Sequence, residues 1–320
     1  MKIKKLYAVY FSATGTTEKI VRRIADGAGA VLGLAAETVD FTLPAARKEH
    51  YSFEEGDLVI FGVPVYAGRV PNLLLPFVQS GFSGGGALAV PVVLYGNRNY
   101  DDGLIELRNT LEADGFHTVA GAAFIGEHSF SYTLAAHRPD EQDLAVADRF
   151  ARQLAEKAAA LPAAPSEPAY VNGCDPIRPY YTPRDRKGNP VNILKVKPKT
   201  SDACVKCGLC VKKCPMGAID PADPSNVPGI CIKCGACVKK CPKGAKYYDD
   251  EKYLYHQHEL RRASPAGPSR KPSSAERGAE VRVHIGPAHS SGVCSNPACP
   301  SFPKIRLTRC ITDDAARPFC

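Results

Sequence analysis

The chain has 320 residues, of which 44% are hydrophobic, and it contains 13 Cys, 41 Lys and Arg, and 33 Asp and Glu. This length corresponds to about two domains, and the hydrophobic content supports packed cores. No stretch approaches the roughly 18 consecutive apolar residues of a membrane-spanning helix, so no membrane span is expected.

Charge divides the chain into two unequal halves. Residues 1–162 hold 15 Lys and Arg against 19 Asp and Glu, a net charge of −4, whereas residues 163–320 hold 26 against 14, a net charge of +12. These values sum to the net charge of +8 for the whole chain. The change falls at the Ala/Pro-rich stretch 161–168, so we predict a first domain over residues 1–162.

The first half alternates apolar runs of strand length with helical patterns. Its basic start and short apolar run lead into a Thr/Gly loop rather than a cleavage site, so residues 6–11 are interpreted as a strand and not as a signal peptide. The helix after the loop carries apolar Ile20, Val21 and Ile24 and is expected to end near Gly27. Further strands are predicted at 37–41, 57–63, 88–95 and 118–125, and helices at 71–79, 102–114 and 139–160.

The loop after the first strand has the chemistry of an anion site. Its residues Ser12, Thr14, Gly15, Thr16 and Thr17 bring hydroxyl groups to a helix N-terminus, where backbone N–H groups point outward. The loop lacks the Lys of a Walker loop and the G-x-G-x-x-G of a dinucleotide site, so a single phosphate monoester fits better. The alternative is an ordinary helix cap, because Ser and Thr are common there.

The pattern Ser12-x-Thr14-Gly15-x-Thr17 resembles the phosphate loop of flavodoxins, which holds the phosphate of FMN. The resemblance implies an α/β, flavodoxin-like fold: a doubly wound, parallel five-stranded sheet with FMN at its switch point. It also implies that loops after the third and fourth strands hold the flavin ring between aromatic side chains. The candidates in these loops are Tyr66, Gly68, Gly96, Asn97 and Tyr100, with Arg98 beside Asn97 and Tyr95 at the strand end. Alternatively, the tyrosines only cap the sheet.

His128 follows the fifth strand and is expected at the same rim of the sheet. A role as a general acid is one interpretation, and a hydrogen-bonding surface residue is the other.

Residues 163–199 read as a linker that docks a second domain on the first. Aromatic and basic residues around 180–190 predict an ordered turn, and an extended segment follows at 191–198. Cys174 is isolated in this segment and is expected to be an incidental thiol.

Eight cysteines form two near-copies of one pattern. CVKCGLCVKKCP covers 204–215 and CIKCGACVKKCP covers 231–242; ten of the twelve positions are identical, and each copy reads C-x2-C-x2-C-x3-C-P. In two-cluster ferredoxins the fourth Cys ligates the other cluster. We therefore expect two [4Fe–4S] clusters, and the proposed ligands are Cys204, Cys207, Cys210 and Cys241 for one and Cys231, Cys234, Cys237 and Cys214 for the other.

Zinc and disulfides fit these cysteines less well. Zinc does not call for a third Cys two residues on or a Pro after the fourth, and a disulfide framework suits small secreted domains. The pattern resembles bacterial-type two-cluster ferredoxins over residues 200 to about 249, and we predict a ferredoxin-type domain over 200–258.

Together the two halves resemble the flavodoxin–ferredoxin hybrid proteins over about residues 1–258. Residues 259–320 are rich in Ser, Pro, Ala and Arg and are predicted to be a disordered tail, for which a non-native C-terminus is one hypothesis. Cys294, Cys299, Cys310 and Cys320 match no known ligand spacing.

The expected function is electron transfer in the cytoplasm between FMN, the two clusters and a redox protein. Lysines lie between the cluster cysteines and suggest either an acidic partner or compensation of cluster charge; they are Lys206, Lys212, Lys213, Lys233, Lys239, Lys240 and Lys243. Nucleic-acid binding is disfavoured because no groove-reading element accompanies them. The alternatives are a flavin-dependent reductase fed by the clusters and an iron–sulfur redox sensor.

Overall fold

The computed structural model describes residues 1–263 and 282–285. The first domain is built on a parallel sheet whose strands are the long apolar runs of the sequence. The main strands are β1 (Lys5–Tyr10), β2 (Ala36–Asp40), β4 (Asp57–Pro64), β6 (Leu88–Tyr95) and β8 (Gly121–Ile125). They lie in the order β2-β1-β4-β6-β8, and each neighbouring pair is parallel. This order confirms the predicted flavodoxin-like, doubly wound fold.

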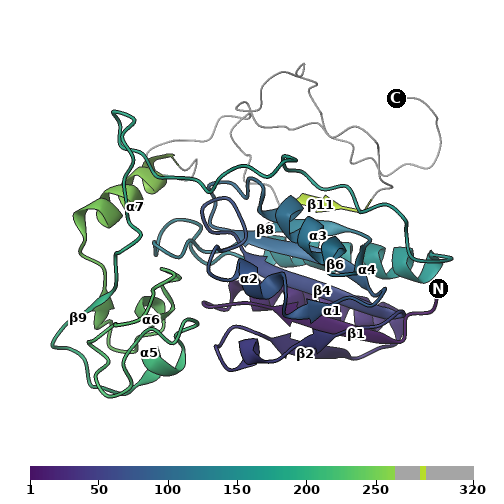
Figure 1. The fold of residues 1–320 in the computed structure, drawn as a ribbon, viewed down its shortest axis with the longest axis horizontal. Helices are drawn as coiled ribbons and strands as arrows, with labels where there is room; N and C mark the ends of the chain where they lie inside the picture. The colour runs from purple at the N-terminus through teal and green to yellow at the C-terminus, as the bar shows by residue number, and fades with distance from the viewer. Residues whose placement is uncertain (264–281, 286–320) are drawn as a thin grey trace.

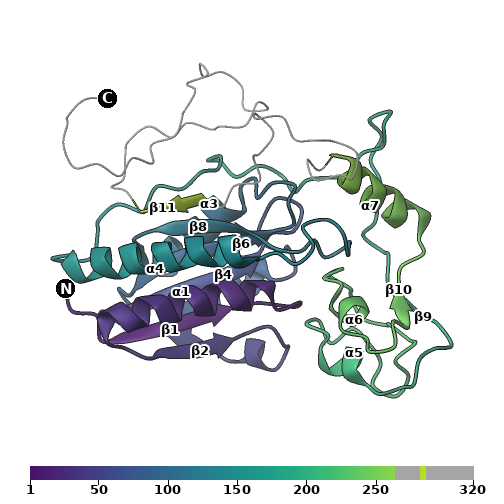
Figure 2. The ribbon, with the colours of Figure 1, turned by 180° about the vertical axis from the view of Figure 1, so that it is seen from behind.

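Helices cover both faces of this sheet. Figure 2 shows α1 (Thr16–Leu32) and α4 (Glu141–Ala160) in front of one face, and Figure 1 shows α2 (Leu75–Val78) and α3 (Gly103–Ala113) in front of the other. Successive strand residues point to opposite faces, so β1 serves both cores: Leu6 packs with α1 and α4, whereas Val9 packs with α3.

Several element boundaries differ from the prediction. The first helix does not end near Gly27 but continues to Leu32 and ends at Gly33, which has a φ of 70°. A Cβ added at Gly27 would lie 2.9 Å from Cβ of Ala151, so this glycine permits the close packing of α1 on α4. The predicted helix 71–79 is helical only in α2, and the predicted strand 118–125 divides into β7 (His117–Thr118) and β8. Unpredicted short elements are η1 (Ala46–Lys48), β3 (Tyr51–Ser52) and β5 (Phe82–Ser83).

The second domain is small and contains both cysteine repeats. Its elements are β9 (Lys199–Thr200), α5 (Leu209–Lys212), α6 (Ala236–Lys239) and β10 (Lys246–Tyr247), and β9 pairs with β10 in antiparallel fashion. Both ribbon views place this domain beyond the end of the sheet at which the parallel strands finish (Figures 1 and 2). Ligands of doubly wound sheets bind at this end.

The linker contacts the first domain and a helix that follows the cysteine repeats. The Tyr181 amide donates to the Ala67 carbonyl at 2.8 Å, and the Tyr180 hydroxyl donates to the Val70 carbonyl at 2.8 Å. Further along, Val191, Ile193 and Val196 form a small apolar core with Tyr253, which lies on α7 (Glu251–Ala263). Cys174 is disulfide-bonded, so the expectation of an incidental free thiol is wrong.

The region predicted as a tail is described only in part. Residues 259–263 are the end of α7, and β11 (Arg282–His284) pairs antiparallel with β8, so these two parts differ from the expectation of a tail without regular structure. Cys294, Cys299, Cys310 and Cys320 lie outside the described residues. Among the described helices, none has the length and apolar character that crossing a membrane requires.

Candidate cofactor sites

The two cysteine repeats fold as copies of one loop. Gly208 and Gly235 occupy equivalent positions, and both have φ 72° and ψ 1°. Lys206 and Lys233 are also equivalent, with φ values of 54° and 58°. The left-handed conformation at the glycines carries no steric penalty because they lack a Cβ. The sequence repeat is therefore a structural repeat.

Each repeat surrounds a cavity with three of its own cysteines and one from the other repeat. The first cavity is lined by Cys204, Cys207, Cys210 and Cys241. The second is lined by Cys231, Cys234, Cys237 and Cys214. These are the two quartets that the sequence predicts, and all eight cysteines are free thiols.

The environment of these sulfurs suits polynuclear iron sites. Backbone N–H groups donate to three of the sulfurs, from Ala218 to Cys214 Sγ at 3.3 Å, from Ala245 to Cys241 Sγ at 3.2 Å and from Lys233 to Cys231 Sγ at 3.4 Å. Such hydrogen bonds stabilise thiolates and tune iron–sulfur clusters.

The loop after β1 presents a row of free backbone donors. Residues 13–17 make no backbone N–H hydrogen bond within the described part of the chain, and Gly15 has a φ of 100°. Five consecutive N–H groups without an acceptor at a helix N-terminus form a cradle for an anion such as a phosphate. The half-buried side chains of Thr14 and Thr16 flank this row.

Two hydroxyl residues of the predicted loop, Ser12 and Thr17, have structural contacts within the domain. Ser12 Oγ accepts from the Glu18 amide at 3.0 Å, so this side chain caps α1. Thr17 is 1% exposed, and its methyl group lies against Gly62 of β4. The anion cradle therefore depends on the backbone more than on these two hydroxyl groups.

The predicted ring-binding residues divide into those at the rim and those in the core. Tyr100 is 7% exposed, with its ring 5.4 Å from that of Tyr95 and its hydroxyl 3.4 Å from Asn172 Nδ2. A side chain that stacks on a ligand needs a free ring face. The Tyr100 ring is packed in the core and offers no such face. Tyr66 is only half-buried and remains at the rim.

The other predicted residues of these loops shape the backbone. A Cβ at Gly96 would collide with the ring of His128, and a Cβ at Gly68 would collide with Asp101, so both glycines permit close packing within the chain. Asn97 has a φ of 65° and turns the loop after β6.

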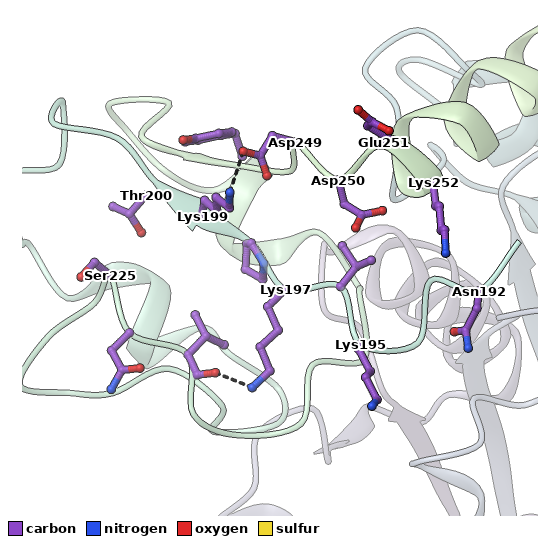
Figure 3. A pocket seen from close by; sticks show the side chains of 15 residues that line it. Asn192, Lys195, Lys197, Lys199, Thr200, Ser225, Asp249, Asp250, Glu251 and Lys252 are labelled. Carbon is purple, nitrogen blue, oxygen red and sulfur yellow. Dashed lines mark hydrogen bonds and ion pairs between the residues drawn. The ribbon is translucent and has the colours of Figure 1, made fainter.

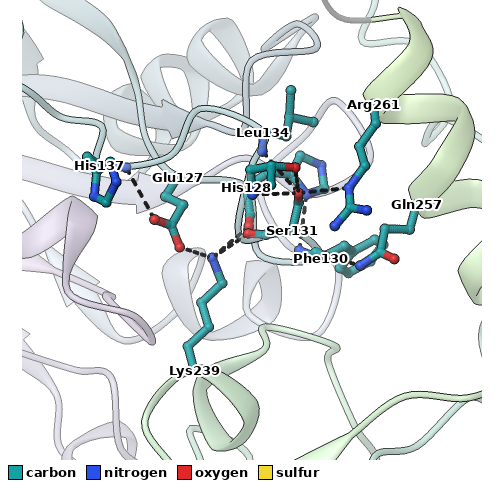
Figure 4. A network of polar contacts seen from close by, with 10 residues as sticks. Glu127, His128, Phe130, Ser131, Leu134, His137, Lys239, Gln257 and Arg261 are labelled. Carbon is teal, nitrogen blue, oxygen red and sulfur yellow. Dashed lines mark hydrogen bonds and ion pairs between the residues drawn. The ribbon is translucent and has the colours of Figure 1, made fainter. Parts of the chain in front are cut away.

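His128 lies inside a polar network that joins the two domains (Figure 4). Its Nδ1 accepts from the Phe130 amide at 3.1 Å, and burial lowers the pKa of His128 to about 3. Lys239 of α6 donates to the carbonyls of His128 at 2.8 Å and Ser131 at 3.0 Å, and it pairs with Glu127. A buried imidazole that stays neutral is not suited to act as a general acid.

The rim of the first domain touches the second cysteine repeat. Tyr66 packs in one apolar cluster with Ile232, Cys234 and Ala236. Burial raises the pKa of Tyr66, and the neighbouring thiols of Cys234 and Cys231 raise it further. The loop after β4 that carries Tyr66 therefore lies against the second quartet.

Arg47 joins the two domains, and the sequence analysis does not predict this contact. Its guanidinium donates to the carbonyls of Phe41 at 2.9 Å and Thr42 at 2.6 Å, and to that of Pro215 in the second domain. Burial lowers the pKa of Arg47, while the thiol of Cys214 acts in the opposite direction, which places the cation near this cysteine. No local pattern could have shown this contact, because 168 residues separate Arg47 from Pro215.

A broad open groove lies between the linker and the start of α7 (Figure 3). Its charged side chains are largely used to hold the segments together: Lys199 pairs with Asp249 at 2.9 Å, and Lys197 donates to the Val227 carbonyl at 2.7 Å. It contains none of the predicted site residues.

Comparison with known families agrees with both halves of the chain. Residues 7–82 match the family described as "Flavodoxin domain", and residues 203–246 match the family described as "4Fe-4S dicluster domain". No curated protein matches the chain.

Solved structures similar to the first domain include flavodoxins. One is a flavodoxin from the domain Archaea, at 16% identity and TM-score 0.35, covering 48% of this chain and 98% of that one. Another is the flavodoxin of Streptococcus pneumoniae TIGR4, at 21% identity and TM-score 0.35, covering 48% and 99%. A third is the rubredoxin oxygen:oxidoreductase of Desulfovibrio gigas, at 16% identity and TM-score 0.33, covering 48% and 36%.

The fold and the family matches define the class: the chain is an electron-transfer protein of two domains. It joins an N-terminal flavodoxin domain to a 4Fe-4S dicluster domain. The cysteine array suggests two [4Fe–4S] clusters, and the flavodoxin domain suggests FMN.

Proposed function

We propose that this protein passes electrons between FMN, two [4Fe–4S] clusters and an external redox protein. FMN carries one or two electrons and each cluster carries one, so together they divide an electron pair into single steps. The observation that carries the proposal is the pair of mixed cysteine quartets, because only a two-cluster arrangement explains why each cavity borrows one cysteine from the other repeat.

The proposed ligands follow the two cavities. Cys204, Cys207, Cys210 and Cys241 hold the first cluster, and Cys231, Cys234, Cys237 and Cys214 hold the second. The free N–H groups of residues 13–17 hold the FMN phosphate, and Tyr66 contacts the ring. Since Tyr66 also touches the second repeat, the second cluster is the one nearer to the flavin.

The geometry gives little support to a reductase in which His128 is the acid. His128 is buried, accepts a backbone hydrogen bond and lies within the interdomain network. We therefore assign it a positioning role at the interface. A redox sensor would use the same centres, and it is distinguished by partner binding that survives loss of the flavin but not of the clusters.

The test is anaerobic purification with iron, sulfide and acid-released flavin quantified. About eight irons and one FMN per chain are expected. Cys241→Ser should then lose the EPR signal of the first cluster and Cys214→Ser that of the second, although each substituted residue lies in the opposite repeat. A protein that holds only zinc, or a Cys241→Ser variant that loses the second cluster alone, would contradict the proposal.

A further inference from the structure

The two cysteine repeats share a sequence and a backbone, but they differ in how much of their outer surface is covered. Val205 of the first repeat is 60% exposed, whereas its equivalent Ile232 is 8% exposed. Cys207 is exposed, and its equivalent Cys234 is buried. Identical local geometry with unequal burial means that something covers the second repeat which the first one lacks.

The cover of the second repeat is the rim of the flavodoxin domain. Ile232 and Ala236 pack in its apolar cluster beside Tyr66. At the edge of this apolar contact, Lys239 donates to the carbonyls of His128 and Ser131 and pairs with the Glu127 carboxylate. The second repeat therefore docks through an apolar centre and a lysine that meets a carboxylate.

The first repeat carries the same elements, and within residues 1–263 and 282–285 they have no partner. Val205 is the equivalent of Ile232 in the first repeat, and Lys212 is the equivalent of Lys239. Lys212 is exposed, and its ammonium group makes no hydrogen bond or ion pair within the described part of the chain. Further exposed lysines, Lys206 and Lys243, lie on either side of the first quartet.

We propose that this free face of the first repeat, formed by Val205, Lys206, Cys207, Lys212 and Lys243, docks an acidic one-electron carrier protein. The inference rests on the proposed function, since it gives the first cluster the role of exchanging electrons with the partner. The partner presents carboxylates to Lys206, Lys212 and Lys243 around an apolar contact for Val205, as Glu127 and Tyr66 do for the second repeat. Opposite charges of this kind steer association and raise its rate.

The electron balance of the exchange is simple. One electron leaves the first cluster, which is oxidised, and enters the carrier, which is reduced; the reverse reaction uses the same surface. Within the chain the electron is replaced from reduced FMN through the second cluster. The covered second repeat offers no such surface, because Cys234 and Cys237 are both buried.

The experiment follows electron transfer from the full-length, dithionite-reduced holoprotein to two haem proteins in a stopped-flow instrument. Cytochrome b5 is the acidic probe and cytochrome c is the basic probe. Lys212→Glu tests the docking face, and Lys2→Glu is the control with the same change in net charge. Lys2 is the second residue of the chain, and Figure 1 marks the N-terminus at the end of the sheet away from the second domain. Iron, flavin and EPR spectra are recorded for every variant.

For cytochrome b5, Lys212→Glu should slow the second-order reaction about tenfold at low salt, and the difference should shrink as ionic strength rises. Lys2→Glu should change the rate by less than about twofold. Equal effects of the two variants, an unchanged rate in Lys212→Glu, or a salt dependence that favours cytochrome c over cytochrome b5 would overturn the docking face. A wild-type protein without clusters or FMN would overturn the proposed function as well, so the two failures are distinguishable.

Discussion

Replacing Lys239 with Met should loosen the contact between the two domains. The Lys239 ammonium donates to two carbonyl oxygens, at 2.8 and 3.0 Å, and pairs with Glu127, while its side chain is 11% exposed. Methionine has a similar length but no donor, so the carboxylate and both carbonyls would lose their partner. Removing one partner of a buried pair costs about 3–5 kcal/mol. Because Glu127 keeps some access to water, we expect the lower end, about 3 kcal/mol.

Native-state hydrogen exchange of the anaerobic holoprotein measures this loss directly. Useful reporters are the amides of Ser131, which donates to the His128 carbonyl at 3.1 Å, and Lys239, which donates to the Gly235 carbonyl at 2.9 Å. A loss of about 3 kcal/mol in the free energy of opening makes exchange on the order of 100-fold faster. The change should be confined to the interface, because the sheet core does not depend on this contact.

Lys212→Met is the matched control for this experiment. Lys212 occupies the equivalent position of the first repeat, and the two glycines that precede α5 and α6 have the same backbone angles. Since Lys212 is exposed, its replacement should change stability by no more than about 0.5 kcal/mol. Equal acceleration of exchange in both variants would refute the idea that Lys239 fastens the domains together.

Three further outcomes follow from the same interface. Gly235→Ala should destabilise the protein more than Gly208→Ala, by about 1–3 kcal/mol in thermal unfolding, because a Cβ at Gly235 would lie 2.5 Å from a carbonyl oxygen and one at Gly208 meets nothing within 4 Å; equal losses would contradict this. Arg47→Gln should lower the midpoint potential of the cluster held by Cys214, because a nearby positive charge is lost; an unchanged potential in an EPR-monitored titration would contradict it. Burial lowers the pKa of His128 from 6.5 to about 3, so only the unfolded chain takes up a proton at this residue as the pH falls from 6.5 to 5. The free energy of unfolding should therefore be about 2 kcal/mol lower at pH 5 than above pH 6.5. His128→Gln should flatten this decline in urea unfolding.

The sheet could be predicted from the sequence because its strands are buried on both faces. β4 and β6 are almost continuously apolar, and such runs have few other structural solutions. The two-residue strands β3 and β5 could not be predicted, since each exists only through pairing with a distant segment. Gly27 does not end α1 as predicted; it permits close packing on α4, which is a tertiary property that a local pattern does not show.

The cysteine quartets were accessible from the sequence because spacing alone carries the information. The same was not true of the ring-binding residues. Whether Tyr66 or Tyr100 faces the rim depends on the path of two loops that have no regular structure, and the structure places Tyr100 in the core. Lys239 was recognised only as one of several lysines, because its carboxylate partner is 112 residues away.

The two positions that differ between the repeats account for their different surroundings. Ala236 of the second repeat is fully buried beside Gly235, where the Ser129 carbonyl approaches closely, and the leucine found at the equivalent Leu209 would fill that space. Ile232 adds a methylene to the valine of the first repeat and reaches the apolar cluster of the flavodoxin domain. The ten shared positions thus build the same cavity twice. The smaller Ala236 and the larger Ile232 favour packing of the second repeat, rather than the first, on the flavodoxin domain.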